Sequence, residues 1–347
     1  MSLFPQQTRR ASPLLREGDA YFGGCFFSAG WHQRKEVAAM KYDKMALTFE
    51  AQADLLIARG LVADRNRLVE RLRATNYYRF TSYLYTFRDP SLSQGEGFHR
   101  GTTLDKVWNL YRFDHGLRQL MLDAVETIEV QVRTQLAYHF AHTYGAFDYL
   151  KPGCFPNFNP AKSDFARWEV KLREQVARAQ ERKGREDFVI HFFHKYGDIH
   201  DMPPIWMTVE LMDFGSVLSF FRGVSIDIRK KVAATIGQPE EVVLSWLLAL
   251  NSIRNRCAHH ARLWNWRMGY TVKIPNRKFP EWHSPALPND KLGIMLLICR
   301  HWLARVNSSH SWHERVEQLF TAFPGIDVAA MGLPPAWRNN PVWKGIP

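Results

Sequence analysis

The chain has 347 residues, of which 46% are hydrophobic and 14% aromatic, so it can bury a large core in one large or two modest domains. Its 46 Lys and Arg outnumber 34 Asp and Glu, and the formal net charge of +12 attracts polyanions such as nucleic acid or an acidic membrane surface. No apolar run approaches the roughly 18 residues of a spanning helix, and the sequence holds no Gly-rich phosphate loop or internal repeat, which excludes membrane-spanning, P-loop and solenoid proteins.

Residues 1–39 show no clear periodicity, and a regular pattern begins only after Met40. We therefore predict a poorly structured extension over 1–39, which is either native or the product of an upstream start codon. An apolar patch over 21–31 follows acidic Glu17 and Asp19 and is interrupted by glycine, serine and cysteine. It is a poor match to a signal peptide.

Two capped helices begin the region that we predict to be helical over 40–100. Thr48 precedes a helix that Gly60 ends, and Asp64 precedes a second helix over 65–75. Together they predict a helical hairpin. We interpret the hairpin as a packing scaffold, and a helix-turn-helix that reads DNA is the weaker alternative.

An aromatic run containing Tyr78 and Arg79 follows the hairpin. An aromatic ring next to a guanidinium can stack on a nucleic-acid base. Rings of this kind also pack at the edge of a core while their polar ends reach solvent. Both interpretations stay open at this point, and Tyr78 and Arg79 are candidate RNA-binding residues.

A long helix is predicted over 102–144, where proline is absent and apolar residues recur at helical spacing. In it Glu129 and Arg133 lie four residues apart, in the favourable orientation for an ion pair. Neighbouring carboxylates, here Glu126 and Glu129, can serve acid and base chemistry. We interpret the Glu129–Arg133 pair as a surface ion pair instead.

The rest of the chain predicts a helical domain over 101–325 and a C-terminal tail over 326–347. A charge-rich segment over about 160–187 has few apolar anchors, so we predict a solvent-facing or mobile insertion there. Residues 270–274 show the best strand-like alternation. Further core helices are predicted over 188–196, 205–221, 228–236, 240–257, 291–306 and 312–323.

The most informative pattern lies over 251–260, where an apolar helix ends in arginine, asparagine and histidine. Arg254 and His259 are separated by four residues. A separation of four or five residues alone carries little information, because other pairs also fit it: Arg305–His310 has four residues between its members, and Arg133–His139 and Arg185–His191 have five. Its setting distinguishes the run, since residues 240–252 are apolar enough to seat a helix in a core and the polar side chains follow where packing stops.

These residue types suit the cleavage of a phosphodiester bond in RNA. His259 can take the proton of the 2′-hydroxyl or protonate the leaving 5′-oxygen, and Arg254 can hold two phosphoryl oxygens. Asn255 can orient either group. On an ideal helix Arg254 and His259 stand about 140° apart, so they flank one substrate group only if the helix end loosens or a second molecule closes the site. The alternative is a helix terminus whose Arg and His interact with the helix dipole.

Several segments in a fixed order carry a resemblance to a known family: residues 52–61, 76–80, 110–114, 128–133, 204–215 and 245–264. Taken together they resemble the AbiD/AbiF-like group of the Abi family. These are abortive-infection, phage-defence proteins whose core is a HEPN-type helical domain. The resemblance covers most of the chain from about Met40 onward.

This resemblance implies a mainly α fold, a HEPN-like helical bundle with the N-terminal helical hairpin and additional helices. It implies that Arg254, Asn255 and His259 are the active residues of an R-x4-H motif and that no metal or other cofactor takes part. It also implies a homodimer that pairs two Arg254/His259 sites. His260 lies one residue further on and can share or replace the role of His259.

We therefore predict a phage-defence protein that acts on RNA as a metal-independent ribonuclease, cleaving through the RNA 2′-hydroxyl. The alternative is a non-cleaving protein that forms a complex with a structured noncoding RNA. In both cases Arg256, His260 and Arg262 join the candidate RNA-binding residues.

The four cysteines favour a reducing compartment. Cys25, Cys154, Cys257 and Cys299 lie far apart and form no CxxC pair, so neither a zinc site nor a disulfide framework is indicated. Reduced thiols and the absence of a convincing targeting segment predict a soluble cytoplasmic protein without membrane association.

Overall fold

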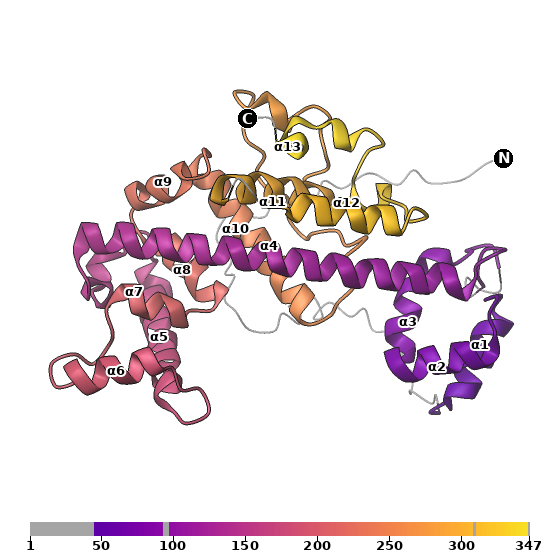
Figure 1. Ribbon diagram of the computed structural model, residues 1–347, viewed down its shortest axis with the longest axis horizontal. Coiled ribbons are helices and arrows are strands. Elements are labelled where there is room, and N and C mark those ends of the chain that lie inside the picture. The colour runs from indigo at the N-terminus through magenta and orange to yellow at the C-terminus, as the bar shows by residue number, and fades with distance from the viewer. Residues whose placement is uncertain (1–44, 93–96, 308–309, 346–347) are drawn as a thin grey trace, which may run out of the picture. The chain divides into compact units, whose positions relative to one another are not determined.

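Most helices of the molecule pack on one long helix, α4 (Leu104–Tyr144), which has 41 residues (Figure 1). The hydroxyl of Thr103 caps its start by accepting a hydrogen bond from the Lys106 N–H. Gly145 ends it with a φ of 111°, a backbone conformation that favours glycine. The long helix predicted over 102–144 is confirmed.

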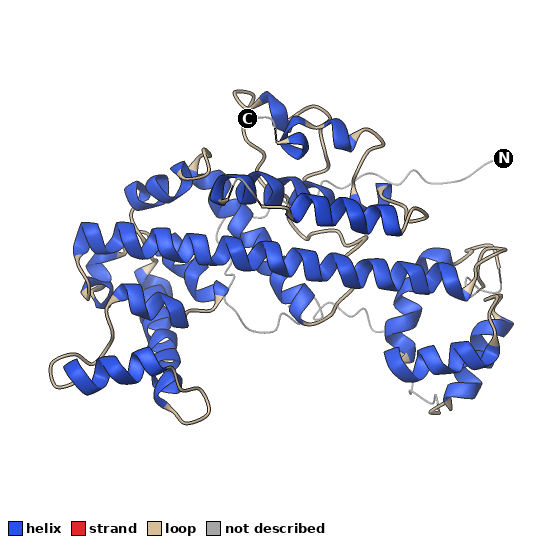
Figure 2. Cartoon of the chain, viewed as in Figure 1, coloured by secondary structure: helices blue, strands red, loops and turns tan. Residues whose placement is uncertain are grey.

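This computed structural model describes residues 45–92, 97–307 and 310–345. Over these residues the chain forms thirteen α-helices and short 3₁₀ turns, with isolated bridges in place of strands (Figure 2). The mainly α class is therefore confirmed. The strand candidate at 270–274 is irregular backbone. The extension predicted over 1–39 lies outside the described residues.

The predicted N-terminal hairpin is present as α1 (Phe49–Ala58) and α2 (Arg65–Thr75), which pack on each other. Thr48 and Asp64 cap them, each accepting a hydrogen bond from the N–H three residues onward, at 3.1 and 2.8 Å. Helix α3 (Tyr77–Leu84) follows and packs on α4. The hairpin thus leads directly to the aromatic run that contains Tyr78 and Arg79.

Helix α5 (Asp164–Gln180) shows that the interpretation of residues 160–187 as solvent-facing is wrong. It packs on α8 (Phe214–Gly223), and the indole N–H of Trp168 donates to the Ser216 carbonyl at 3.1 Å. The buried stripe recurs at every fourth residue: Trp168, Leu172 and Val176. Charged side chains on the other face concealed an amphipathic helix.

The segment predicted as one helix over 205–221 consists of α7 (Ile205–Thr208), a 3₁₀ turn and α8. Asp213 causes the interruption, because its backbone is extended and its carboxylate caps α8 by accepting from the Ser216 N–H at 2.8 Å. An N-cap residue needs this non-helical backbone. The remaining helices are α6 (Asp187–Tyr196), α9 (Ile226–Ala234), α10 (Glu240–Ala258), α11 (Leu292–Val306), α12 (Trp312–Ala322) and α13 (Pro341–Lys344).

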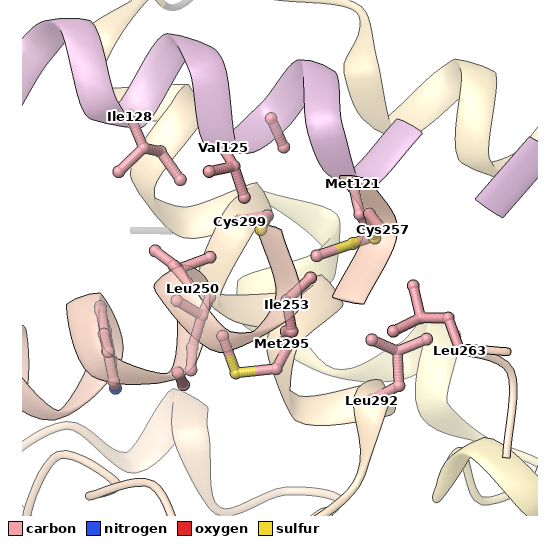
Figure 3. Close-up of a cluster of buried hydrophobic side chains, with 14 of the residues drawn as sticks. Met121, Val125, Ile128, Leu250, Ile253, Cys257, Leu263, Leu292, Met295 and Cys299 are labelled. Carbon is pink, nitrogen blue, oxygen red and sulfur yellow. The ribbon is translucent and has the colours of Figure 1, made fainter. Parts of the chain in front are cut away.

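Helices α4, α10 and α11 share one cluster of the core, as Figure 3 shows. Side chains from the three helices meet there with 0–1% exposure: Met121, Val125, Ile128, Leu250, Ile253, Cys257, Met295 and Cys299. Burial of a Leu, Ile or Met side chain stabilises a fold by about 1.5–3 kcal/mol. Helix α10 is therefore anchored as far as Cys257, which lies between Arg254 and His259.

The segment predicted as a C-terminal tail over 326–347 contains α13, which packs on α11. Trp337 and Trp343 in this segment are buried, with ring centroids 4.7 Å apart. The described part of this segment is therefore anchored on the core by its buried tryptophans.

Candidate functional site

The candidate site begins where α10 ends, in a turn closed by two backbone hydrogen bonds. The His260 N–H donates to the Cys257 carbonyl at 2.9 Å, and the Ala261 N–H donates to the Arg256 carbonyl at 3.0 Å. This pattern is a Schellman motif with His259 as the C-cap. His260 has a φ of 56°, the left-handed conformation that glycine usually supplies at this place. A residue with a side chain adopts it at a cost of about 1–2 kcal/mol.

The three predicted catalytic residues are all at this helix end. Arg254 is half-buried, whereas Asn255 and His259 are exposed. The Arg254 guanidinium donates to the Asn255 side-chain oxygen at 3.4 Å. The exposed His260 follows directly. The structure therefore brings one guanidinium, one amide and two imidazoles to the same solvent-facing terminus.

A carboxylate of α4, that of Glu129, interacts electrostatically with Arg254. Glu129 accepts a hydrogen bond from Arg133 at 2.6 Å, and the two side chains are only 15% and 12% exposed. The interpretation of this pair as a surface ion pair is therefore wrong. Burial raises the pKa of Glu129 above its usual range, and the guanidiniums of Arg133 and Arg254 oppose the rise.

Arg133 is held from a second element as well, because its guanidinium also donates to the Met212 carbonyl, at 2.9 Å, just before α8. The spacing of Glu129 and Arg133 was visible in the sequence. Their burial comes from the packing of α8 and α10 on α4, and the local sequence does not indicate this packing.

Helix α3 and the segment after α10 are joined by two hydrogen bonds, one donated by an arginine of each. Arg79 donates to the backbone carbonyl of His260, and Arg262 donates to the backbone carbonyl of Ser82. These contacts bring two predicted RNA-binding residues, Arg79 and His260, together across 181 positions of sequence. Tyr78, next to Arg79, is 73% exposed and has its ring open to solvent.

Arg256 lies on the inner side of the same turn. Its guanidinium donates to the Arg262 carbonyl at 2.7 Å and sits 4.9 Å over the ring of Trp266. Burial and the neighbouring Arg262 lower the pKa of Arg256. Arg79, Arg256 and Arg262 each donate one hydrogen bond to a backbone carbonyl. A guanidinium has five N–H donors, so each of them keeps further donors.

The turn is held from below by Asp114 of α4, a residue that sequence reasoning did not single out. Its carboxylate is fully buried and accepts hydrogen bonds from the backbone N–H groups of Leu263 and Trp264. Trp264 itself is buried, and its indole N–H donates to the Asp327 carbonyl at 3.0 Å. Trp264 thus packs in the core and is closed to a nucleic-acid base.

Two further features of the described residues bear on the kind of site. Over the described ranges, no group of three His, Cys, Asp or Glu side chains is arranged to hold a metal ion. None of the helices found there combines the length and the apolar character that crossing a bilayer requires.

The comparison with known families matches the same part of the chain. A family model described as Abi-like protein matches residues 70–265, more than half of the 347 residues. The chain belongs to the Abi-like protein family. Searches of curated proteins and of solved structures give no match.

The part of this Abi-like chain that the family model matches runs from α2 to just beyond Trp264. It therefore contains α3, α4, α10 and the whole turn after α10. Membership supports a phage-defence role in abortive infection. Every predicted catalytic and RNA-binding residue of the Abi-like chain lies inside the matched region, and so do Asp114 and Glu129.

Proposed function

We propose that this Abi-like protein is a metal-independent ribonuclease that cleaves RNA through its 2′-hydroxyl during abortive infection. The observation that carries the proposal is the end of α10, where the half-buried Arg254 and the exposed His259 and His260 lie within seven consecutive residues. The formal net charge of +12 supports an RNA substrate.

In this mechanism His259 takes the proton of the 2′-hydroxyl, and the resulting oxygen attacks the adjacent phosphorus. The bond from phosphorus to the 5′-oxygen breaks, the 5′-oxygen takes a proton from solvent water, and a 2′,3′-cyclic phosphate remains. Arg254 offsets the charge that grows on the phosphoryl oxygens. The half-buried Glu129 helps to hold the Arg254 guanidinium at the helix end, because its negative charge attracts that cation. Asn255 holds Arg254 or the phosphate.

The RNA backbone then follows the remaining donors of Arg79, Arg256 and Arg262 around the turn, and the exposed ring of Tyr78 stacks on a base. Because Arg254 and His259 stand about 140° apart on a helix, we propose that two copies pair their sites and that a residue from each flanks the scissile phosphate.

The test is cleavage of RNA by the purified chain in the presence of a chelator. His259→Ala is expected to abolish cleavage, and the wild type is expected to leave cyclic phosphate ends. His191→Ala is the matched control, because Arg185 and His191 have a similar spacing of five intervening residues and both are exposed, Arg185 just before α6 and His191 within it. Equal cleavage by the His259→Ala and His191→Ala variants would falsify the assignment.

A second function is supported by the exposed Tyr78 beside Arg79 and by the net charge: a protein that binds a structured noncoding RNA and leaves it intact. Sequencing of the RNA that co-purifies, together with its end chemistry, separates the two. One discrete RNA with intact ends, retained by His259→Ala and released by Arg254→Glu, supports binding. A mixture of fragments with cyclic phosphate ends supports cleavage.

A further inference from the structure

Asp114, in the first third of α4, is a buried acceptor on which three elements converge. Its side chain is 0% exposed. One carboxylate oxygen accepts the backbone N–H groups of Leu263 and Trp264, at 3.0 and 2.5 Å. The other accepts the hydroxyl of Tyr83 from α3, at 2.6 Å, and the guanidinium of Arg118. One side chain thus ties α3, α4 and the segment after α10 together.

The donors around this carboxylate explain why an acid stands there. Leu263 is 0% and Trp264 5% exposed, so their N–H groups need a partner inside the protein. All four neighbours donate, and a carboxylate is the side chain that only accepts. Arg118 balances the charge, which a buried carboxylate requires. An amide at position 114 would turn an NH₂ group toward Tyr83 and Arg118.

The segment that carries the candidate histidines is therefore fixed at both ends. The Schellman hydrogen bonds hold its beginning at His260 and Ala261. Asp114 holds its end at Leu263 and Trp264. Only Arg262 lies between the two anchors, so a shift at Leu263 and Trp264 is passed directly to the backbone of Ala261 and His260, next to His259.

We propose that Asp114 is a positioning residue, which sets His259 and His260 relative to Arg254 by fixing the backbone at Leu263 and Trp264. This inference rests on the proposed ribonuclease function. It does not place Asp114 in contact with the RNA, because the carboxylate is buried and its lone pairs are used. A displacement of about 1 Å in a catalytic group can lower the rate about 100-fold.

Two variants test the inference. Asp114→Asn exchanges one acceptor oxygen for a donor, and Tyr83→Phe removes one donor while it leaves Asp114 and Arg118 paired. The matched control is Tyr149→Phe, because Tyr149 is also fully buried and its hydroxyl donates to the Pro203 carbonyl at 2.6 Å, away from the turn. Should Asp114→Asn fail to fold, Tyr83→Phe decides the question.

Two readouts are measured on folded protein. Hydrogen exchange of the amides over 259–264 needs no RNA, and it is expected to become faster in Asp114→Asn and Tyr83→Phe but not in Tyr149→Phe. For cleavage we expect kcat to fall about 100-fold in Asp114→Asn and less in Tyr83→Phe, with KM within a few-fold of the wild-type value. If the loss of any buried tyrosine hydroxyl lowered activity through general destabilisation, Tyr149→Phe would lose activity as much as Tyr83→Phe does.

The outcomes separate the two proposals. Unchanged exchange over 259–264 in both variants overturns the positioning role, whether or not the wild type cleaves RNA. Faster exchange with wild-type kcat also overturns it. A wild-type chain that leaves RNA intact refutes the ribonuclease, and the exchange experiment still decides whether Asp114 fixes the turn.

Discussion

Arg79 of α3 donates a hydrogen bond to the backbone carbonyl of His260, the one residue of the turn with a left-handed backbone. Two residues later, Arg262 returns a hydrogen bond to the carbonyl of Ser82 in α3. The two contacts form a reciprocal bridge between the aromatic run and the motif. Residues that the sequence offered as separate RNA-binding candidates therefore also hold each other in place.

Arg79→Ala tests this bridge. A hydrogen bond from a charged side chain at a partly exposed position contributes about 1 kcal/mol, so the free energy of unfolding should fall by about that amount in urea melts. Cleavage should fall as well, because the backbone at His260 loses a partner. Arg178→Ala, at a 72% exposed side chain on α5, is the control and should leave both unchanged. Wild-type stability in Arg79→Ala would show that the bridge contributes nothing.

His260→Gly should separate stability from function. Glycine adopts the φ of 56° without strain, which stabilises the folded state, but it also gives the unfolded chain more conformational freedom. The free energy of unfolding should therefore rise by about 1 kcal/mol net. Loss of the imidazole should at the same time lower RNA cleavage. The measurements are thermal unfolding and cleavage of the same preparation. A stabilised variant with full activity would mean that His260 serves the turn alone.

Mixing two inactive variants tests the paired site. If each phosphate is flanked by Arg254 of one copy and His259 of the other, Arg254→Ala and His259→Ala should complement each other when they are combined. Random pairing of equal amounts should restore about a quarter of the wild-type rate. Each variant alone should stay inactive. No recovery in a mixture that demonstrably forms mixed dimers would place both residues of a working site on one chain.

A buried histidine predicts loss of stability in acid. His301 lies beneath Trp246 and Trp282, and burial, with Arg305 nearby, lowers its pKa from 6.5 to about 3. Below pH 6.5 the imidazole of His301 binds a proton in the unfolded chain but stays neutral in the folded chain until the pH approaches 3. The stabilisation is therefore complete above pH 6.5 and declines by about 1.4 kcal/mol per pH unit as the pH falls toward 3.

Urea melts between pH 8 and pH 4 measure this loss, and His301→Gln should flatten the slope. Arg178→Ala is the control, since that side chain is 72% exposed and an arginine does not titrate over this pH range, so the slope should stay as in the wild type. An equal slope in the wild type and in His301→Gln would assign the acid sensitivity to other groups.

Local chemistry made much of the helical order predictable. Thr48, Asp64 and Thr103 cap helices at the positions that their side chains indicate. Where apolar and charged residues alternate at helical spacing, as in α5, the charge count concealed the stripe that includes Trp168. The interruption at Asp213 was missed because apolar residues continue on both sides of it.

The residues that build the site were predictable only in part. Arg254 and His259 share one helix end, so the sequence could place them together. The burial of Glu129 depends on helices that are distant in sequence, and Asp114 meets Leu263 across 149 positions. The left-handed backbone of His260 could not be predicted, because the residue that usually marks this conformation is glycine. Contacts of this kind follow from tertiary packing, which a local pattern does not encode.

The hold of Asp114 on Leu263 and Trp264 limits how this motif can be transplanted. A cassette of residues 251–264 grafted onto another helical scaffold would carry Arg254 and His259 but leave two backbone amides without an acceptor. The smallest portable unit is therefore the cassette together with the stretch of α4 around Asp114 and Arg118, and with Tyr83 from α3.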